Sequence, residues 1–137
     1  MKKKSMVILC AIVCAFAWCF TALADDTWTV TEAGALKVKS GVTLSGEVVL
    51  PDAVDGIPVT SLQVGALNNQ TGITSIVMPD TIQSMGGSAI TFLDGVTNLK
   101  LSQNLTVIGD MNGILKGLTD LTIPASVRYI GDSFTSL

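Results

Sequence analysis

The sequence predicts a solenoid that is mainly β, in which parallel strands and short helical turns repeat along the chain behind an N-terminal β-hairpin cap. Two observations indicate this architecture. Residues 73–95, 96–117 and 118–137 form three similar lines that start 23 and then 22 residues apart. Each line opens with the pattern apolar-x-x-apolar-x-apolar. One such unit cannot cover its own apolar edge, whereas stacked units share a continuous core.

The same positions are apolar in every line. A second apolar pair, three residues apart, follows the opening triplet, and a glycine follows that pair each time. We expect the middle residues of the triplets to form one buried column, and the glycines to adopt a positive φ at a sharp turn. The triplets are Ile73, Ile76 and Met78; Val96, Leu99 and Leu101; and Leu118, Leu121 and Ile123. The pairs and glycines are Ile82, Met85 and Gly86; Leu105, Ile108 and Gly109; and Val127, Ile130 and Gly131.

An earlier, stretched repeat precedes these three lines. Residues 59–67 match residues 82–90 at a spacing of 23, and the DAVDGIP segment before them is longer than its counterpart by five residues. Further upstream, WTVTEAGALKVKSG alternates apolar and polar residues around a Glu-Ala-Gly turn, which predicts a β-hairpin. We therefore expect a β cap over 25–46 and a repeat domain over 47–137. Its repeats fall at about 47–72, 73–95, 96–117 and 118–137.

Residues 1–24 have the features of a secretory signal peptide. Lys2 to Lys4 are positive, Met6 to Phe20 are apolar, and Ala22-Leu23-Ala24 offers a small-x-small cleavage site. A retained membrane anchor is the alternative, but the apolar run is shorter than the roughly 20 residues that span a bilayer. Lipid attachment at Cys19 is disfavoured because a large residue precedes it. We expect a mature chain without a membrane span that is secreted, on the cell surface or periplasmic.

The mature chain lacks cysteine, because all three cysteines fall in the leader. Its stability must therefore come from apolar burial rather than from disulfides. Its charge is negative, with five lysines and arginines against eleven aspartates and glutamates. This balance argues against binding nucleic acid or anionic membrane surfaces, both of which select basic patches.

A period of 20 to 29 residues with an L-x-x-L-x-L opening is the leucine-rich-repeat signature. Together with LTIPASVRYIGD and VDGIPVTSL, it resembles the bacterial surface repeats of the BspA type, also called the Treponema type, over residues 28–137. The family pattern continues with Ala-Phe, which Asn112-Gly113 lacks. The resemblance implies a leucine-rich-repeat solenoid exported to a bacterial surface, where such proteins serve in adhesion or protein recognition.

Catalytic chemistry finds little support in the mature chain, which has no histidine or cysteine and therefore no Ser-His-Asp, Cys-His or common zinc constellation. Asp110 and Asp132 recur at the repeat period, and two carboxylates could serve a glycosidase or bind calcium. An aspartate after a turn glycine more commonly bonds local backbone amides. We predict no enzyme activity, no cofactor and no metal site.

The outward positions of the repeat strands are the candidate ligand-binding surface, because residues between buried ones point away from the core. They form a hydroxyl-rich, nearly uncharged face with a threonine at the same position of each line. The alternative is that threonine simply favours strands and keeps this face soluble. The candidate residues are Thr74, Val77, Thr97, Asn98, Lys100, Thr119, Asp120 and Thr122, and Ser75 is also expected to point outward.

Aromatic residues are few and scattered, which argues against a surface that stacks sugar rings. We expect Trp28 to pack in the cap, Phe92 and Phe134 to fill the convex side, and Arg128 and Tyr129 to be exposed. The last line lacks a polar cap, so we also expect Leu118, Leu121, Ile123, Val127 and Ile130 to be uncovered and to favour self-association.

Two functions follow from the sequence. The first is a secreted or cell-surface recognition or adhesion module without catalytic activity, which binds an extracellular protein or glycan through the solenoid surface. The alternative is a structural or assembly protein that forms homo-oligomers or joins a partner through its last repeat. The two hypotheses differ in which surface carries the function.

Overall fold

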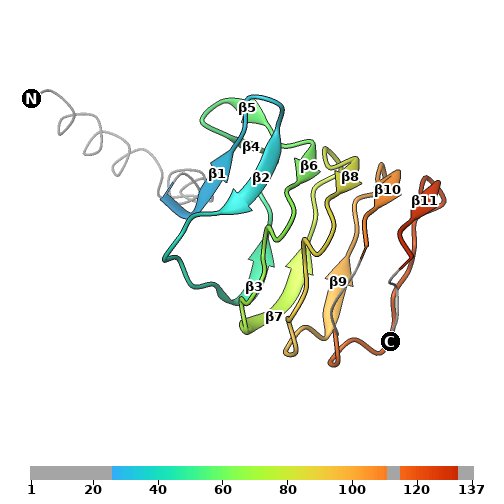
Figure 1. The fold of residues 1–137 in the computed structure, drawn as a ribbon. Coiled ribbons are helices and arrows are strands. Elements are labelled where there is room, and N and C mark those ends of the chain that lie inside the picture. The colour runs from blue at the N-terminus through green and yellow to red at the C-terminus, as the bar shows by residue number, and fades with distance from the viewer. Residues whose placement is uncertain (1–25, 111–114, 133–137) are drawn as a thin grey trace, which may run out of the picture.

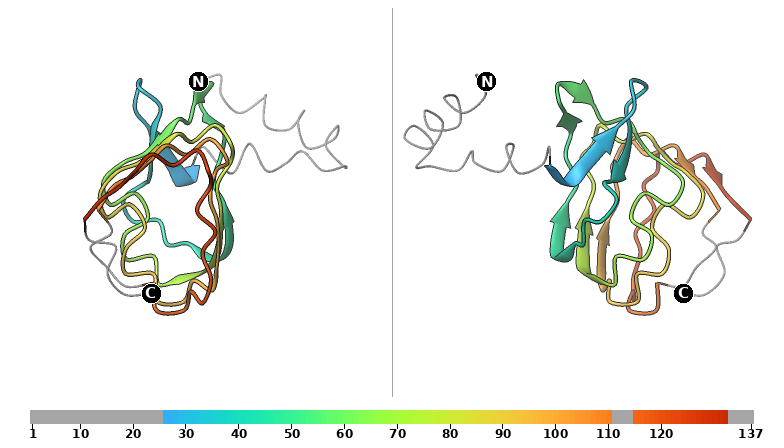
Figure 2. Two further views of the ribbon diagram at one scale, coloured as in Figure 1. Left: turned by 90° about the vertical axis from the view of Figure 1, so that its right-hand side faces the viewer. Right: turned by 60° about the vertical axis from the view of Figure 1, so that its left-hand side comes forward.

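The structure is a computed structural model that describes residues 26–110 and 115–132. It is a β-solenoid in which successive turns of the chain overlie one another, as the view along the axis makes clear (Figure 1, Figure 2). The predicted leader, Phe134 and the Asn112-Gly113 departure lie outside the described residues. The predicted mainly β, parallel-stranded fold is confirmed.

One side of the solenoid is a six-stranded sheet that passes through four turns. Its first pair is antiparallel and every later pair is parallel. The register joins Ser61 to Ser84 and Ser84 to Val107, which confirms the spacing of 23 read from the sequence. In spatial order the strands are β1 (Trp28–Val30), β2 (Ala35–Val38), β6 (Ser61–Leu62), β8 (Ser84–Met85), β10 (Val107–Ile108) and β11 (Tyr129–Ile130).

The other side is a three-stranded parallel sheet of β3 (Ser45–Val49), β7 (Gly72–Val77) and β9 (Asn98–Lys100). Ile76 and Leu99 of the predicted column are in register and buried, and Val48 of the first turn extends the column. Leu121 packs against the same core from the fourth turn, where residues 118–123 form no strand. The first solenoid strand begins at Ser45, just inside the range expected for the cap.

Two β-hairpins lie at the N-terminal end of the solenoid. The predicted cap hairpin is present as β1 and β2, with Trp28 opposite Val38 and the Trp28 side chain buried. The five-residue extension forms a second hairpin from β4 (Ala53–Val54) and β5 (Ile57–Pro58). Its central residues, Asp55 and Gly56, both have positive φ, the conformation that a two-residue type I′ turn requires.

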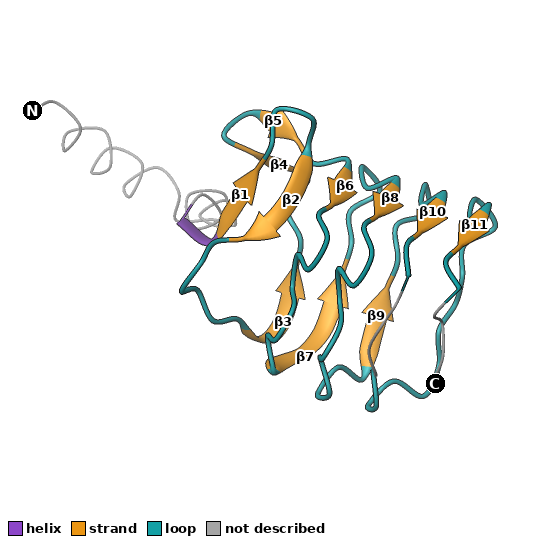
Figure 3. Cartoon of the chain, in the orientation of Figure 1, coloured by secondary structure: helices purple, strands orange, loops and turns teal. Residues whose placement is uncertain are grey.

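The predicted helical turns are single hydrogen-bonded turns rather than helices. Ile82, Leu105 and Val127 each donate an N–H to the carbonyl oxygen three residues earlier, at 3.1–3.2 Å, at equivalent places in successive turns. Within the described residues, helix is confined to residues 26 and 27 (Figure 3). Among all the residues that the structure describes, no helix has the length and apolar character needed to cross a membrane.

The glycines that follow each apolar pair have a different role from the one predicted. Gly86, Gly109 and Gly131 do not have positive φ, so the expectation of a left-handed turn is wrong. A Cβ on Gly86 would lie 2.7 Å from the backbone nitrogen of Val64, and one on Gly109 would lie 2.7 Å from that of Gly87. These glycines are needed because the backbones of adjacent turns approach too closely to admit a side chain.

Two burial predictions are also wrong. Phe92 was expected in the core, but 53% of it is exposed, and its positive φ of 56° lies in a turn between buried Thr91 and Leu93. Leu118 was expected to be uncovered, yet it is buried together with Leu115. Its N–H donates to the Leu115 carbonyl oxygen at 3.0 Å, a turn that folds this corner inward.

Candidate functional site

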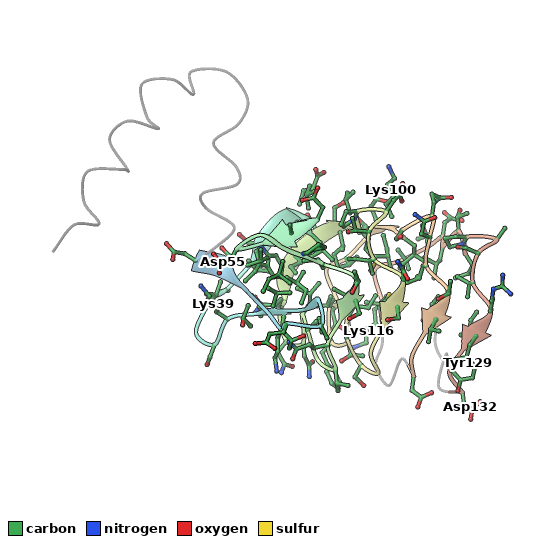
Figure 4. All side chains as sticks on the ribbon, turned by 90° about the horizontal axis from the view of Figure 1, so that it is seen from above. Lys39, Asp55, Lys100, Lys116, Tyr129 and Asp132 are labelled. Carbon is green, nitrogen blue, oxygen red and sulfur yellow. The ribbon has the colours of Figure 1, made fainter. Side chains whose placement is uncertain are left out.

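The eight candidate residues lie on the outer side of the three-stranded sheet and on the fourth turn beside it. Seven of them are exposed and Val77 is half-buried. Lys100 projects from the side of the solenoid opposite to Tyr129 and Asp132 (Figure 4), so the two sheets present separate outer surfaces. The strand register places Val77 next to Lys100, and Ser75 next to Asn98.

Ser75 differs from the sequence-based expectation because it is only 9% exposed. It lies in the central strand, between Glu47 on one side and Asn98 on the other. Its Oγ has no hydrogen-bond partner. Ser75 therefore belongs to the floor of the face rather than to its accessible surface.

A groove of about 370 Å³ brings five of the eight candidates together. One wall is β9 with the residues that follow it, and the other wall comes from the fourth turn. The candidates in the groove are Val77, Asn98, Lys100, Asp120 and Thr122, joined by Leu99, Leu101 and Gln103. Sequence reasoning missed these last three because it assigned Leu99 and Leu101 wholly to the core and looked for a sheet face rather than a groove.

The groove lies where the hydrogen-bond ladder of the three-stranded sheet stops. Leu50 N–H donates to the Val77 carbonyl oxygen at 2.9 Å, and Met78 N–H donates to that of Lys100 at 3.0 Å. Leu101 is the equivalent residue of the third turn. Across the part of the chain that the structure describes, its N–H has no hydrogen-bond partner, and no backbone hydrogen bond joins β9 to residues 118–123.

The three remaining candidates, Thr74, Thr97 and Thr119, lie outside the groove. Thr97 bonds the Thr74 carbonyl oxygen twice, through its N–H at 2.9 Å and through its Oγ1 at 3.4 Å. The Thr119 hydroxyl instead donates to the neighbouring Asp120 carboxylate at 3.2 Å. The threonine ladder thus links the second and third turns but does not continue to the fourth.

Asp110 and Asp132 have a structural arrangement. The Asp110 carboxylate accepts the Asp132 N–H at 2.9 Å, so it holds the next turn rather than local amides of its own turn. The residues that the structure describes contain no group of three acidic or other ligating side chains suited to a metal ion. This geometry gives the Asp110 carboxylate a role in the contact between the third and fourth turns.

The fourth turn also exposes apolar side chains. Ile123, Tyr129 and Ile130 are 36%, 54% and 41% exposed, while Leu121 and Val127 are partly buried against the core. Arg128 is exposed, as expected. Large exposed apolar residues also occur at Val49, Val64 and Phe92, so this turn holds half of those on the described chain.

Comparison with solved structures identifies the fold. A leucine-rich repeat protein of T. pallidum superimposes with a TM-score of 0.60 at 17% identity, over 80% of this chain and 63% of that one. A leucine-rich repeat protein from Bacteroides capillosus gives 0.63 at 23% identity, over 80% and 90%. This chain thus spans less than two thirds of the T. pallidum protein.

The fold is therefore that of the bacterial leucine-rich-repeat solenoids. No protein-family model matches the sequence, and no curated protein matches it significantly. The narrower resemblance to the BspA type continues to depend on the sequence motifs alone.

Proposed function

We propose that this protein is an exported recognition module without catalytic activity, which binds an extracellular macromolecule through the outer side of the three-stranded sheet. The observation that carries this proposal is the gathering of Val77, Asn98, Lys100, Asp120 and Thr122, from three successive turns, around one groove. Side chains from separate turns thereby line one surface that a ligand can contact. Leucine-rich-repeat solenoids are typically protein-binding scaffolds, which agrees with this role.

Export is part of the proposal and depends on the leader sequence. Residues 1–24 combine a positive n-region, an apolar run and a small-x-small site, which support export. An adhesive role on a bacterial surface is what the BspA-type resemblance adds. The partner proposed is an extracellular protein or glycan.

The test is capture of extracellular proteins and glycans on immobilised residues 25–137. Thr97→Glu with Lys100→Glu should abolish capture, because both side chains are exposed on the proposed face. A matched control is Gln83→Glu with Arg128→Glu, which changes the net charge equally but alters exposed residues outside the candidate surface. Equal capture by wild type and the face variant, with both folded by circular dichroism, would contradict the proposal.

Assembly is a second candidate, favoured by the exposed Ile123, Tyr129 and Ile130 on the fourth turn. Its partner would be a second copy of the chain. Size-exclusion chromatography with light scattering should then show oligomers that Ile123→Ser with Ile130→Ser abolishes, and that Val64→Ser does not. A monomer at every concentration up to about 1 mM, the limit of weak association, would contradict assembly.

A further inference from the structure

The groove beside β9 runs along the edge of a strand. Four consecutive residues, Asn98, Leu99, Lys100 and Leu101, all line it. Successive side chains of a strand point to opposite faces of the sheet, so one face cannot present all four. Only the edge of the strand is accessible to all of them, so the groove opens between the third and fourth turns.

That edge offers an unpaired backbone N–H group. The N–H groups at the equivalent positions of the first and second turns, Leu50 and Met78, are bonded to the next turn. The N–H of Leu101 is not bonded, and the described residues 118–123, although they lie opposite, contribute no backbone partner. An open strand edge of this kind is a template for another strand.

The opposite wall of the groove, formed by the fourth turn, contributes side chains rather than backbone hydrogen bonds. Asp120 and Thr122 line it, and Lys100 lies on the β9 wall, so one negative and one positive group face the groove. An occupant of low net charge fits this balance. Carbohydrate is less suited, because the residues that line the groove include no aromatic ring on which a sugar could stack.

We infer that this groove is a strand-addition site, which takes a short extended peptide of low net charge from another protein and pairs its main chain with β9. The inference rests on the proposed recognition function and specifies its ligand. Main-chain hydrogen bonds would supply the affinity and the groove side chains the selectivity. A contact along the three residues of β9 and the adjoining Leu101, at about 3.3 Å per residue, matches a peptide of about four paired residues.

The probe is an end-capped peptide with the sequence GITSIVMP, that of residues 72–79. This segment contains β7, which already pairs with the other edge of β9, so its side-chain alternation suits that strand. The control is the same peptide methylated on its backbone nitrogens, which keeps the side chains but removes the N–H donors. Fluorescence anisotropy should show binding of the first peptide and none of the second.

Amide hydrogen exchange, followed by NMR, locates the contact. The Met78 amide should be protected in the free protein because it is already bonded, whereas the Leu101 amide should exchange fast and become protected only with peptide. Thr122→Trp should fill the groove and weaken peptide binding at least about tenfold, which corresponds to 1.4 kcal/mol. Ala125→Trp, at an exposed position of the same turn outside the groove, should leave binding unchanged.

Three outcomes would overturn strand addition: a dissociation constant no lower than about 1 mM, equal binding of the methylated peptide, or a bound peptide that leaves the Leu101 amide unprotected. Capture of a glycan or folded protein that Thr97→Glu with Lys100→Glu abolishes, without peptide binding, would keep the proposed function and reject this ligand. If Thr97→Glu with Lys100→Glu did not reduce capture while the peptide still bound, the peptide site would stand and the proposed recognition function would be rejected.

Discussion

The two parallel sheets of the solenoid differ at the fourth turn. The six-stranded sheet continues into it, because the N–H groups of Arg128 and Gly131 donate to the carbonyl oxygens of Thr106 and Ile108 at 2.8 and 2.9 Å. The three-stranded sheet ends at β9, although residues 118–123 repeat the strand pattern. The same turn is therefore joined by a ladder on one side and only packed on the other.

The connections that lead into the two sides of the fourth turn also differ in length. Five residues lie between the end of each apolar triplet, at Met78, Leu101 and Ile123, and the short strand that follows it. The connection from Asp110 to Leu115 is instead one residue shorter than that from Gly87 to Leu93. The chain therefore reaches residues 118–123 through a shorter connection than the one that leads to residues 96–101. The connection that leads to β11 has the same length as those that lead to β8 and β10. Residues 96–101 and 118–123 share the same apolar pattern. Such a pattern specifies which side chains are buried, but it does not specify how closely two turns approach each other.

The largest expected effect contrasts the same residue type in the central strand of the three-stranded sheet and in the fourth turn beside that sheet. Ile76→Ala should lower the free energy of unfolding by about 3 kcal/mol, because Ile76 is fully buried and its removal leaves a cavity. Ile123→Ala should cost about 1 kcal/mol or less, because Ile123 is 36% exposed. Equilibrium urea denaturation measures both losses. Equal losses would mean that the fourth turn is packed as tightly as the second.

A smaller effect tests the close approach of turns on the six-stranded side. Gly86→Ala should destabilise the protein by about 2 kcal/mol, because the new Cβ would meet the backbone atoms of the preceding turn at 2.7–2.9 Å. Gly87→Ala is the matched control, since its nearest neighbour would be the Asp110 carbonyl oxygen at 3.7 Å.

We expect Gly87→Ala to be neutral or to stabilise the protein by up to about 0.5 kcal/mol, because alanine restricts the unfolded chain. Thermal unfolding of the two variants side by side gives the comparison. If Gly86→Ala were as stable as Gly87→Ala, close approach of the backbones would not be the reason for the repeated glycine.

Much of the architecture could be predicted from the sequence because it depends on local periodicity. The spacing of 23, the cap hairpin and the alignment of Ile76 with Leu99 all follow from which side chains must be buried. Five of the eight candidate residues could be brought together by the same reasoning, since the outward positions of stacked strands are neighbours. Their role in binding remains a prediction.

The sequence by itself determined the repeat, the buried column and the strand register, because apolar alternation states which side of each segment avoids water. Only the tertiary structure decided that Gly86 and Gly109 serve close approach rather than a left-handed turn, that Phe92 is exposed, and that the ladder ends at β9. These features depend on the separation between backbones that are more than twenty residues apart in the chain. That separation is set by how all the turns pack together, which no single repeat records.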